Sequence, residues 1–209
     1  MTQTKIGVGM ISATSIGDAK VLQGDGSWVT PSAGALTFIN TSDLSSAATY
    51  AFTAVNASSY DGYGFFLHNV IPATDDVHFY ARTSTDAGSS YDSGSSDYAW
   101  GTTSWGIYSS DSADTHINLI DVQTSAGFSV GSAANEPGCS GWIWLIAPHL
   151  TGYTVVQSVL SAMSDNAVMM TFASSGCRLS AADVDAFQLL FSSGAIESGT
   201  ITAYGVANA

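Results

Sequence analysis

The chain is poor in basic residues. Its 209 residues include four lysines and arginines against 17 aspartates and glutamates, the formal net charge is −13, and only 10% of residues are charged. An average soluble domain is roughly 25% charged. Four cations cannot neutralise a run of phosphates, so the composition argues against a nucleic-acid-binding protein. An anionic membrane surface would repel the chain for the same reason.

Long apolar runs and signal-like segments are also missing. The longest apolar-rich stretch, residues 142–148, is too short to cross a bilayer. Residues 1–10 have neither the basic segment nor the apolar core typical of a signal peptide, so we expect a protein made in a cytoplasm. The two cysteines, Cys139 and Cys177, do not form a Cys-x-x-Cys pair. Two buried thiols or one disulfide both fit this pattern.

The chain does contain enough apolar residues to form a hydrophobic core, and its apolar segments are spaced like β-strands. Hydrophobic residues make up 45% of it and aromatic residues 11%, which excludes intrinsic disorder. From residue 36 onward, short aromatic and β-branched segments are separated by turn residues at intervals of roughly 8 to 15 residues. The strands expected are 35–40, 50–54, 63–70, 78–84, 98–103, 117–122, 141–146, 153–161, 167–173, 186–192 and 200–206. The pattern predicts an all-β domain over residues 36–209, an antiparallel β-sandwich of jelly-roll type.

Three segments need a separate interpretation. Residues 84–97 and 109–114 are rich in serine, glycine and aspartate and are expected to be exposed loops. Residues 180–191 fit either a helix capped by Ser180 or a buried strand.

The first 35 residues differ from the rest. They hold both lysines and few large apolar residues, without a sustained period of 2 or 3.6, and we interpret them as an extended arm that becomes ordered on a partner surface. Within the arm, the glycines around Asp25 favour a tight turn between two extended segments. The residues expected to attach the arm to its partner are Lys5, Lys20, Leu22 and Trp28.

Several segments of the chain resemble a known module. Residues 60–75 read as a strand followed by an Asn-x-x-Pro turn, residues 79–84 as a strand ending in Arg-x-Ser, and residues 97–100 as a Tyr-x-Trp strand. This order resembles the β-sandwich module of tailed-bacteriophage virion proteins. The other matching segments are 141–145, similar to its central strand, 190–206, similar to its C-terminal hairpin, and 22–28 (Leu-Gln-Gly-Asp-Gly-Ser-Trp), similar to the element joining a phage-fibre shaft to its next module.

The resemblance implies a virion surface protein, usually a homotrimer, with no chemistry of its own. Residues 1–35 leave no room for a long shaft, and the chain has no heptad repeat to make one. We therefore expect a structural protein, a capsid decoration (cement) or short head-fibre protein, that binds the major capsid protein or a virion adaptor protein through its arm. The alternative is a receptor-binding tail-fibre module that contacts host surface glycan. Both place the protein on the virion after synthesis in a bacterial host.

Residue patterns that would indicate an enzyme are missing. There is no Gly-x-Ser-x-Gly motif, and the only glutamates are Glu136 and Glu197, so we expect no catalytic activity. Loop aspartates leave two interpretations open, Ca²⁺ ligands or turn formers: Asp75, Asp76, Asp86, Asp92 and Asp97. No other cofactor is expected.

Aromatic residues gather between positions 60 and 108 beside aspartate and serine. Aromatic rings flanked by hydroxyl groups suit carbohydrate stacking, whereas most such rings in β-sandwiches pack in the core or at its rim. The residues expected to contact a glycan, if one is bound, are Tyr91, Trp100, Trp105 and Tyr108.

Overall fold

The computed structural model describes residues 21–22, 28–29, 36–55, 59–121 and 128–207. The chain divides into two compact units, Met1–Gly34 and Ala35–Ala209. In the first unit β1 (Val21–Leu22) pairs antiparallel with β2 (Trp28–Val29). Lys5, Lys20 and the expected turn at residues 24–26 lie outside the described residues.

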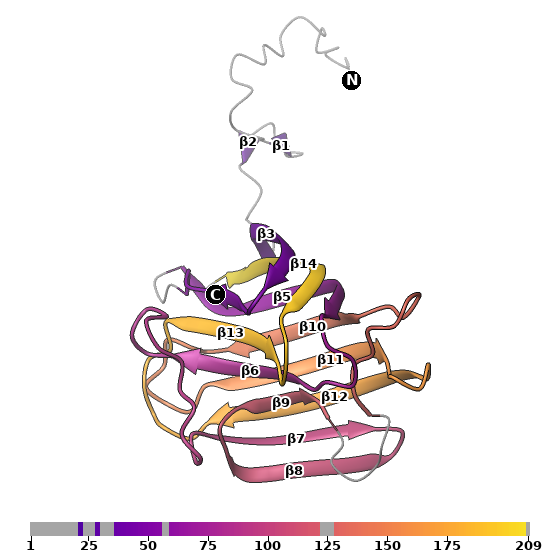
Figure 1. Cartoon of the computed structure of the whole chain (residues 1–209). Helices are drawn as coiled ribbons and strands as arrows, with labels where there is room; N and C mark the ends of the chain where they lie inside the picture. The colour runs from indigo at the N-terminus through magenta and orange to yellow at the C-terminus, as the bar shows by residue number, and fades with distance from the viewer. Residues whose placement is uncertain (1–20, 23–27, 30–35, 56–58, 122–127, 208–209) are drawn as a thin grey trace, which may run out of the picture. The chain divides into compact units, whose positions relative to one another are not determined.

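The second unit is an antiparallel β-sandwich, which confirms the predicted fold class. Its two sheets have the strand orders β3-β14-β5-β10-β11-β12-β7-β8 and β4-β13-β6-β9, and the smaller sheet covers part of one face of the larger (Figure 1). The strands are β3 (Leu36–Ala47), β4 (Tyr50–Phe52), β5 (Tyr60–Pro72), β6 (Phe79–Ser84), β7 (Tyr98–Ser104), β8 (Ile107–Asp114), β9 (Ile117–Ile120), β10 (Cys139–Ile146), β11 (Val155–Met163), β12 (Met169–Arg178), β13 (Ala186–Phe191) and β14 (Ile196–Ala207). Among the residues that the structure describes there is no helix, and hence none that could span a membrane.

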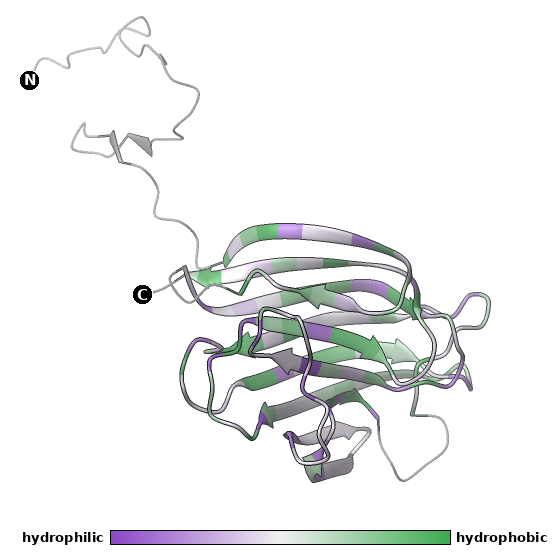
Figure 2. Ribbon diagram, turned by 60° about the vertical axis from the view of Figure 1, so that its left-hand side comes forward, coloured by the Kyte–Doolittle hydropathy of each residue, from purple (hydrophilic) through white to green (hydrophobic). Residues whose placement is uncertain are grey.

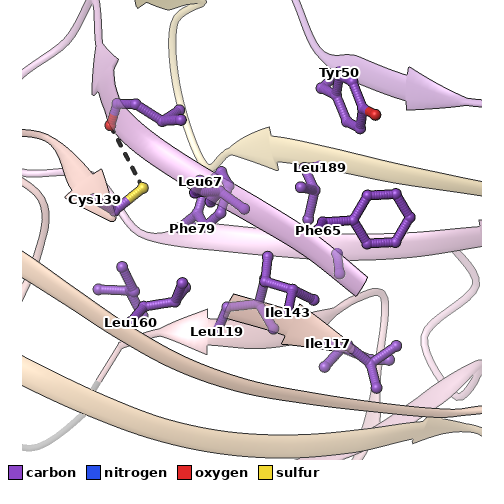
Figure 3. Close-up of a cluster of buried hydrophobic side chains, with 14 of the residues drawn as sticks. Tyr50, Phe65, Leu67, Phe79, Ile117, Leu119, Cys139, Ile143, Leu160 and Leu189 are labelled. Carbon is purple, nitrogen blue, oxygen red and sulfur yellow. Dashed lines mark hydrogen bonds between the residues drawn. The ribbon is translucent and has the colours of Figure 1, made fainter. Parts of the chain in front are cut away.

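The core lies between the two sheets because strands such as β11 and β12 bury every second residue. Figure 2 shows hydrophobic and hydrophilic bands along the strands. Val77, Phe79 and Ala81, at alternate positions of one segment, are all buried, with exposures of 2% or less. Across the sheets Phe65 stacks on Phe187 with ring centroids 5.0 Å apart. These side chains and their aliphatic neighbours fill the interior (Figure 3).

Both cysteines are free thiols, so the disulfide alternative is wrong. Cys139 is in the core, where its Sγ donates a hydrogen bond to the carbonyl oxygen of Val70 at 3.4 Å (Figure 3). Burial raises the pKa of this thiol to about 12. Cys177 is half-buried on β12.

Every segment expected as a strand overlaps an observed strand. Residues 180–191, for which helix and strand were both open, are now assigned, and one expected loop is corrected. In the window 180–191 the helical alternative is wrong, because Ala186–Phe191 forms β13 and pairs on both sides, with β4 and β6. The expectation of a loop at 109–114 is also wrong, since these residues belong to β8. β8 is an edge strand, where serine and aspartate side chains face solvent and discourage pairing with another chain.

Candidate functional site

The outer face of the eight-stranded sheet, the face away from the core, carries a row of aromatic side chains. β10 has Ile143 and Leu145 in the core, at 0% and 1% exposure, so its alternate residues Trp142 and Trp144 point outward. The indoles of these two tryptophans stack with an interplanar angle of 9° and centroids 5.3 Å apart. Phe66 of β5 lies 5.0 Å from Trp142.

The row continues onto β14 and β3. Tyr204 lies 5.7 Å from Trp142, and Phe38 lies edge-on to Tyr204 at 6.1 Å. Phe38 is 60% exposed and Phe66 37% exposed, so the rings form a surface rather than a second core. We call this row, formed by Phe38, Phe66, Trp142, Trp144 and Tyr204, the aromatic ridge.

Glycines allow two aromatic rings to lie flat on the sheet. Gly64 is opposite Trp144 across the β5–β10 pair, and a Cβ at this glycine would lie 2.7 Å from Cζ3 of the indole. A Cβ on Gly101 would lie 2.7 Å from the hydroxyl oxygen of Tyr108. The rings therefore cover exposed backbone of neighbouring strands, an arrangement that also helps to fix strand register.

Beside the ridge the same face is hollowed. Small residues on β12 and β7, Ala173, Ser175 and Gly101, lie between the large side chains of Trp144 on β10 and Tyr108 on β8. The difference in side-chain size leaves an open hollow of about 520 Å³. A second space of about 540 Å³ shares Gly101, Tyr108, Gln157 and Ser175 with it and continues toward Ala99. We refer to the two together as the hollow.

The residues lining the hollow are almost free of charge. Asp111, in its second part, is the one charged residue among them. Of the two arginines in the described ranges, Arg178 is buried, with Nε donating to Oδ2 of Asp92 at 2.6 Å, and Arg82 donates to the Thr115 carbonyl oxygen. Neither of these two arginines lines the hollow.

The four aromatic residues expected to contact glycan differ in position and in exposure to solvent. Trp100 is 4% exposed, and its Nε1 donates to Oδ2 of Asp114 at 2.8 Å, so the expectation of an exposed ring is wrong there. The reason is alternation, which turns Tyr98, Trp100 and Thr102 of β7 inward. Trp105 is 68% exposed at the β7–β8 turn and Tyr91 is half-buried in the β6–β7 loop. Tyr108, 67% exposed, borders both parts of the hollow, whereas the buried Trp100 borders only the second part.

Sequence reasoning missed Trp144 and Gln157. The signal for Trp144 was available, because two tryptophans separated by one buried isoleucine must share the outer face of a strand. No local signal singles out Gln157, whose place in the hollow follows from its pairing with Trp144 on one side and Ser175 on the other. Of the expected attachment residues, Leu22 and Trp28 are opposite each other in the β1–β2 pair.

Asp75 and Asp86 accept hydrogen bonds from residues in or next to loops. Asp86 accepts from the hydroxyls of Ser84 and Ser90 at 2.7 and 2.6 Å, and these bonds lower its pKa to about 2. Asp75 accepts from the backbone N–H of Ser132 at 2.8 Å. Within the described ranges no three His, Cys, Asp or Glu side chains come together as a metal-binding group. The observed role of Asp75 and Asp86 is that of loop-forming acceptors.

A separate cluster of titratable groups lies on the smaller sheet. The rings of Tyr80 and His116 stack with centroids 3.6 Å apart, and Nδ1 of His78 lies 3.3 Å from Oδ1 of Asp121. Burial lowers the pKa of His116 and raises that of Tyr80 to about 12. Both rings are therefore neutral at pH 7 and pack as aromatic groups linking β6 to the β8–β9 connection.

No protein-family model matches the chain, and no curated protein and no solved structure matches it.

Proposed function

We propose that the chain is a structural protein of a tailed-phage virion, a homotrimeric capsid decoration or short head-fibre protein. Residues 1–35 attach it to the major capsid protein or to a virion adaptor protein, and the β-sandwich faces outward. The sequence resemblance supports this assignment, and the observation that carries it is the aromatic ridge. An exposed, uncharged row of large side chains is typical of protein–protein contact surfaces.

The charge of the chain explains why such a surface matters for assembly. Copies that each carry a formal charge of −13 repel one another over most of their surfaces. A face formed by Phe38, Phe66, Trp142 and Tyr204 allows copies to meet without bringing carboxylates together. Trimerisation then multiplies the attachment segments, so that several weak contacts to a particle hold the assembly with high avidity.

The test separates attachment from assembly. Deleting residues 1–34 removes the first unit and leaves the complete sandwich, which we expect to stay trimeric in light scattering but no longer to bind particles in a sedimentation assay. Phe38→Ser, in a side chain that is 60% exposed, should instead reduce the trimer to monomers while the sandwich stays folded. Normal particle binding by the truncated protein would contradict the attachment model, and a monomeric parent protein would contradict the assembly model.

A further inference from the structure

The hollow beside the aromatic ridge has aromatic walls on two sides. Trp144 borders it on β10 and Tyr108, 67% exposed, projects over it from β8. The face of a pyranose ring is lined by C–H groups, which are weakly positive and pack against the negative face of an aromatic ring. Two aromatic walls across an open trough can therefore hold a sugar ring without enclosing it.

The floor of the hollow supplies hydrogen-bonding groups without charge. Gln157 contributes an amide with two donor hydrogens and an acceptor oxygen, and Ser175 and Thr103 contribute hydroxyl groups that both donate and accept. Sugar hydroxyls likewise donate and accept, so the floor and the rim of a pyranose ring are chemically complementary. A purely apolar partner surface would leave these groups without hydrogen bonds and would lose free energy.

The length of the hollow favours a chain of sugars over a single one. Its borders run along β7 from Thr103 to Ala99, four steps of about 3.3 Å each, or about 13 Å. The trough is open toward solvent, so a linear oligosaccharide can lie along it with its ends projecting beyond.

The charge of the surroundings selects against acidic ligands. Neither arginine of the described ranges lines the hollow, Asp111 adds a carboxylate to it, and the chain as a whole carries a formal charge of −13. Uronic acids, sialic acids and phosphorylated sugars would meet repulsion without a compensating cation. A neutral ligand would meet no such electrostatic repulsion.

We propose that the hollow between Trp144 and Tyr108 is a binding site for a neutral linear oligosaccharide. Of the aromatic residues expected to contact glycan, the site includes Tyr108, while Trp100 borders only its second part and is itself buried. The site also includes Trp144 and Gln157, which were not expected from the sequence. It does not depend on the proposed virion function, because binding is a property of the sandwich alone.

The test uses the purified full-length protein. The probes are linear oligosaccharides of glucose, of mannose and of galactose, with oligogalacturonate as the acidic counterpart, and binding is followed by calorimetry and tryptophan fluorescence. We expect at least one neutral series to bind and oligogalacturonate not to bind. Tyr108→Ala and Gln157→Ala should each weaken binding about tenfold, equivalent to about 1.4 kcal/mol. Ser175→Phe, which fills the hollow from its floor, should abolish binding.

The matched control is Tyr153→Ala, because Tyr153 is 59% exposed and lies in the β10–β11 connection outside the hollow. It should bind as the parent does. Failure of all neutral series to bind, preference for oligogalacturonate, or unchanged affinity in the Tyr108 and Gln157 variants would overturn the proposal. A change of mass in light scattering for Tyr108→Ala, with no sugar bound by the parent, would show that another copy covers the hollow. Particle sedimentation reports separately on the virion function.

Discussion

Replacing Gly64 by alanine tests whether the aromatic ridge is packed as described. The new methyl carbon would lie 2.7 Å from Cζ3 of Trp144 and 3.1 Å from Cε3 and Cη2. Carbon atoms in favourable contact are about 3.5–4.0 Å apart, so the indole must move by about 1 Å. Its stacking on Trp142 opposes that movement. Overpacking of this kind costs about 1–3 kcal/mol.

The opposing effect is small and can be measured separately. Gly64 is not among the glycines with positive φ, so alanine fits its backbone and should stabilise by about 0.4–1 kcal/mol through the unfolded state. The net loss expected for Gly64→Ala is about 1–2 kcal/mol in the free energy of unfolding, and the melting temperature should fall by about 2–4 °C for each kcal/mol.

A double-mutant cycle decides whether Trp144 is the cause. A Trp144→Ala background lacks the indole that the new methyl group would overlap. There Gly64→Ala should raise the free energy of unfolding instead of lowering it, with a coupling energy of about 1–3 kcal/mol in urea unfolding. Gly101→Ala is the matched control. Its methyl would lie 2.7 Å from the hydroxyl oxygen of Tyr108 and 3.2 Å from Cε2 and Cζ, but the Tyr108 side chain is 67% exposed and can swing away into solvent. If Gly64→Ala stabilised the parent as much as it stabilises the Trp144→Ala variant, the packing of the ridge would be refuted.

Two further predictions concern pH and a turn. Burial lowers the pKa of His116 below its ordinary value of 6.5, which the unfolded chain keeps, so the unfolded state binds a proton first as pH falls. The free energy of unfolding should therefore be greatest above pH 6.5 and decline below it toward the folded-state pKa. His116→Gln should flatten that decline in urea titrations at a series of pH values, and an unchanged slope would contradict this assignment. Trp105 and Gly106 form a two-residue hairpin turn with φ of 51° and 77°, a conformation that asparagine adopts more readily than tryptophan. Trp105→Asn should raise the free energy of unfolding by about 0.5–1 kcal/mol, and a loss of stability would mean that the exposed indole makes stabilising contacts.

The division of the outer face into two zones has a simple origin in side-chain size. β10 carries Trp142 and Trp144 where β12 carries Ala173 and Ser175. On this single continuous sheet the large side chains of one strand project and form the ridge. The small side chains two strands away leave the hollow. The proposed contact between copies and the proposed sugar site thus meet at Trp144 of β10 and otherwise use different strands, so that Phe38 can be changed in the ridge and Tyr108 in the hollow without altering the other zone.

The sequence by itself determined the class of the fold and much of the core. Alternation is a local property, since neighbouring side chains on a strand must point to opposite faces. It puts Val77, Phe79 and Ala81 on one face, and this face is buried. The same rule would have placed Trp142 and Trp144 outside together. It gave no sign of β8, because an edge strand can carry serine and aspartate that elsewhere indicate a loop.

The candidate site could not be predicted from the sequence, because it is assembled by long-range strand pairing. Tyr108 and Trp144 belong to strands that are distant in sequence, and they border one hollow because pairing places β11, β12 and β7 between β10 and β8. That strand order depends on the summed free energy of pairing and core packing between residues that are distant in sequence. A local sequence pattern carries no information about such contacts. The inward turn of Trp100 and the outward position of Tyr108 likewise follow from register, since a shift by one residue would exchange the two faces of a strand.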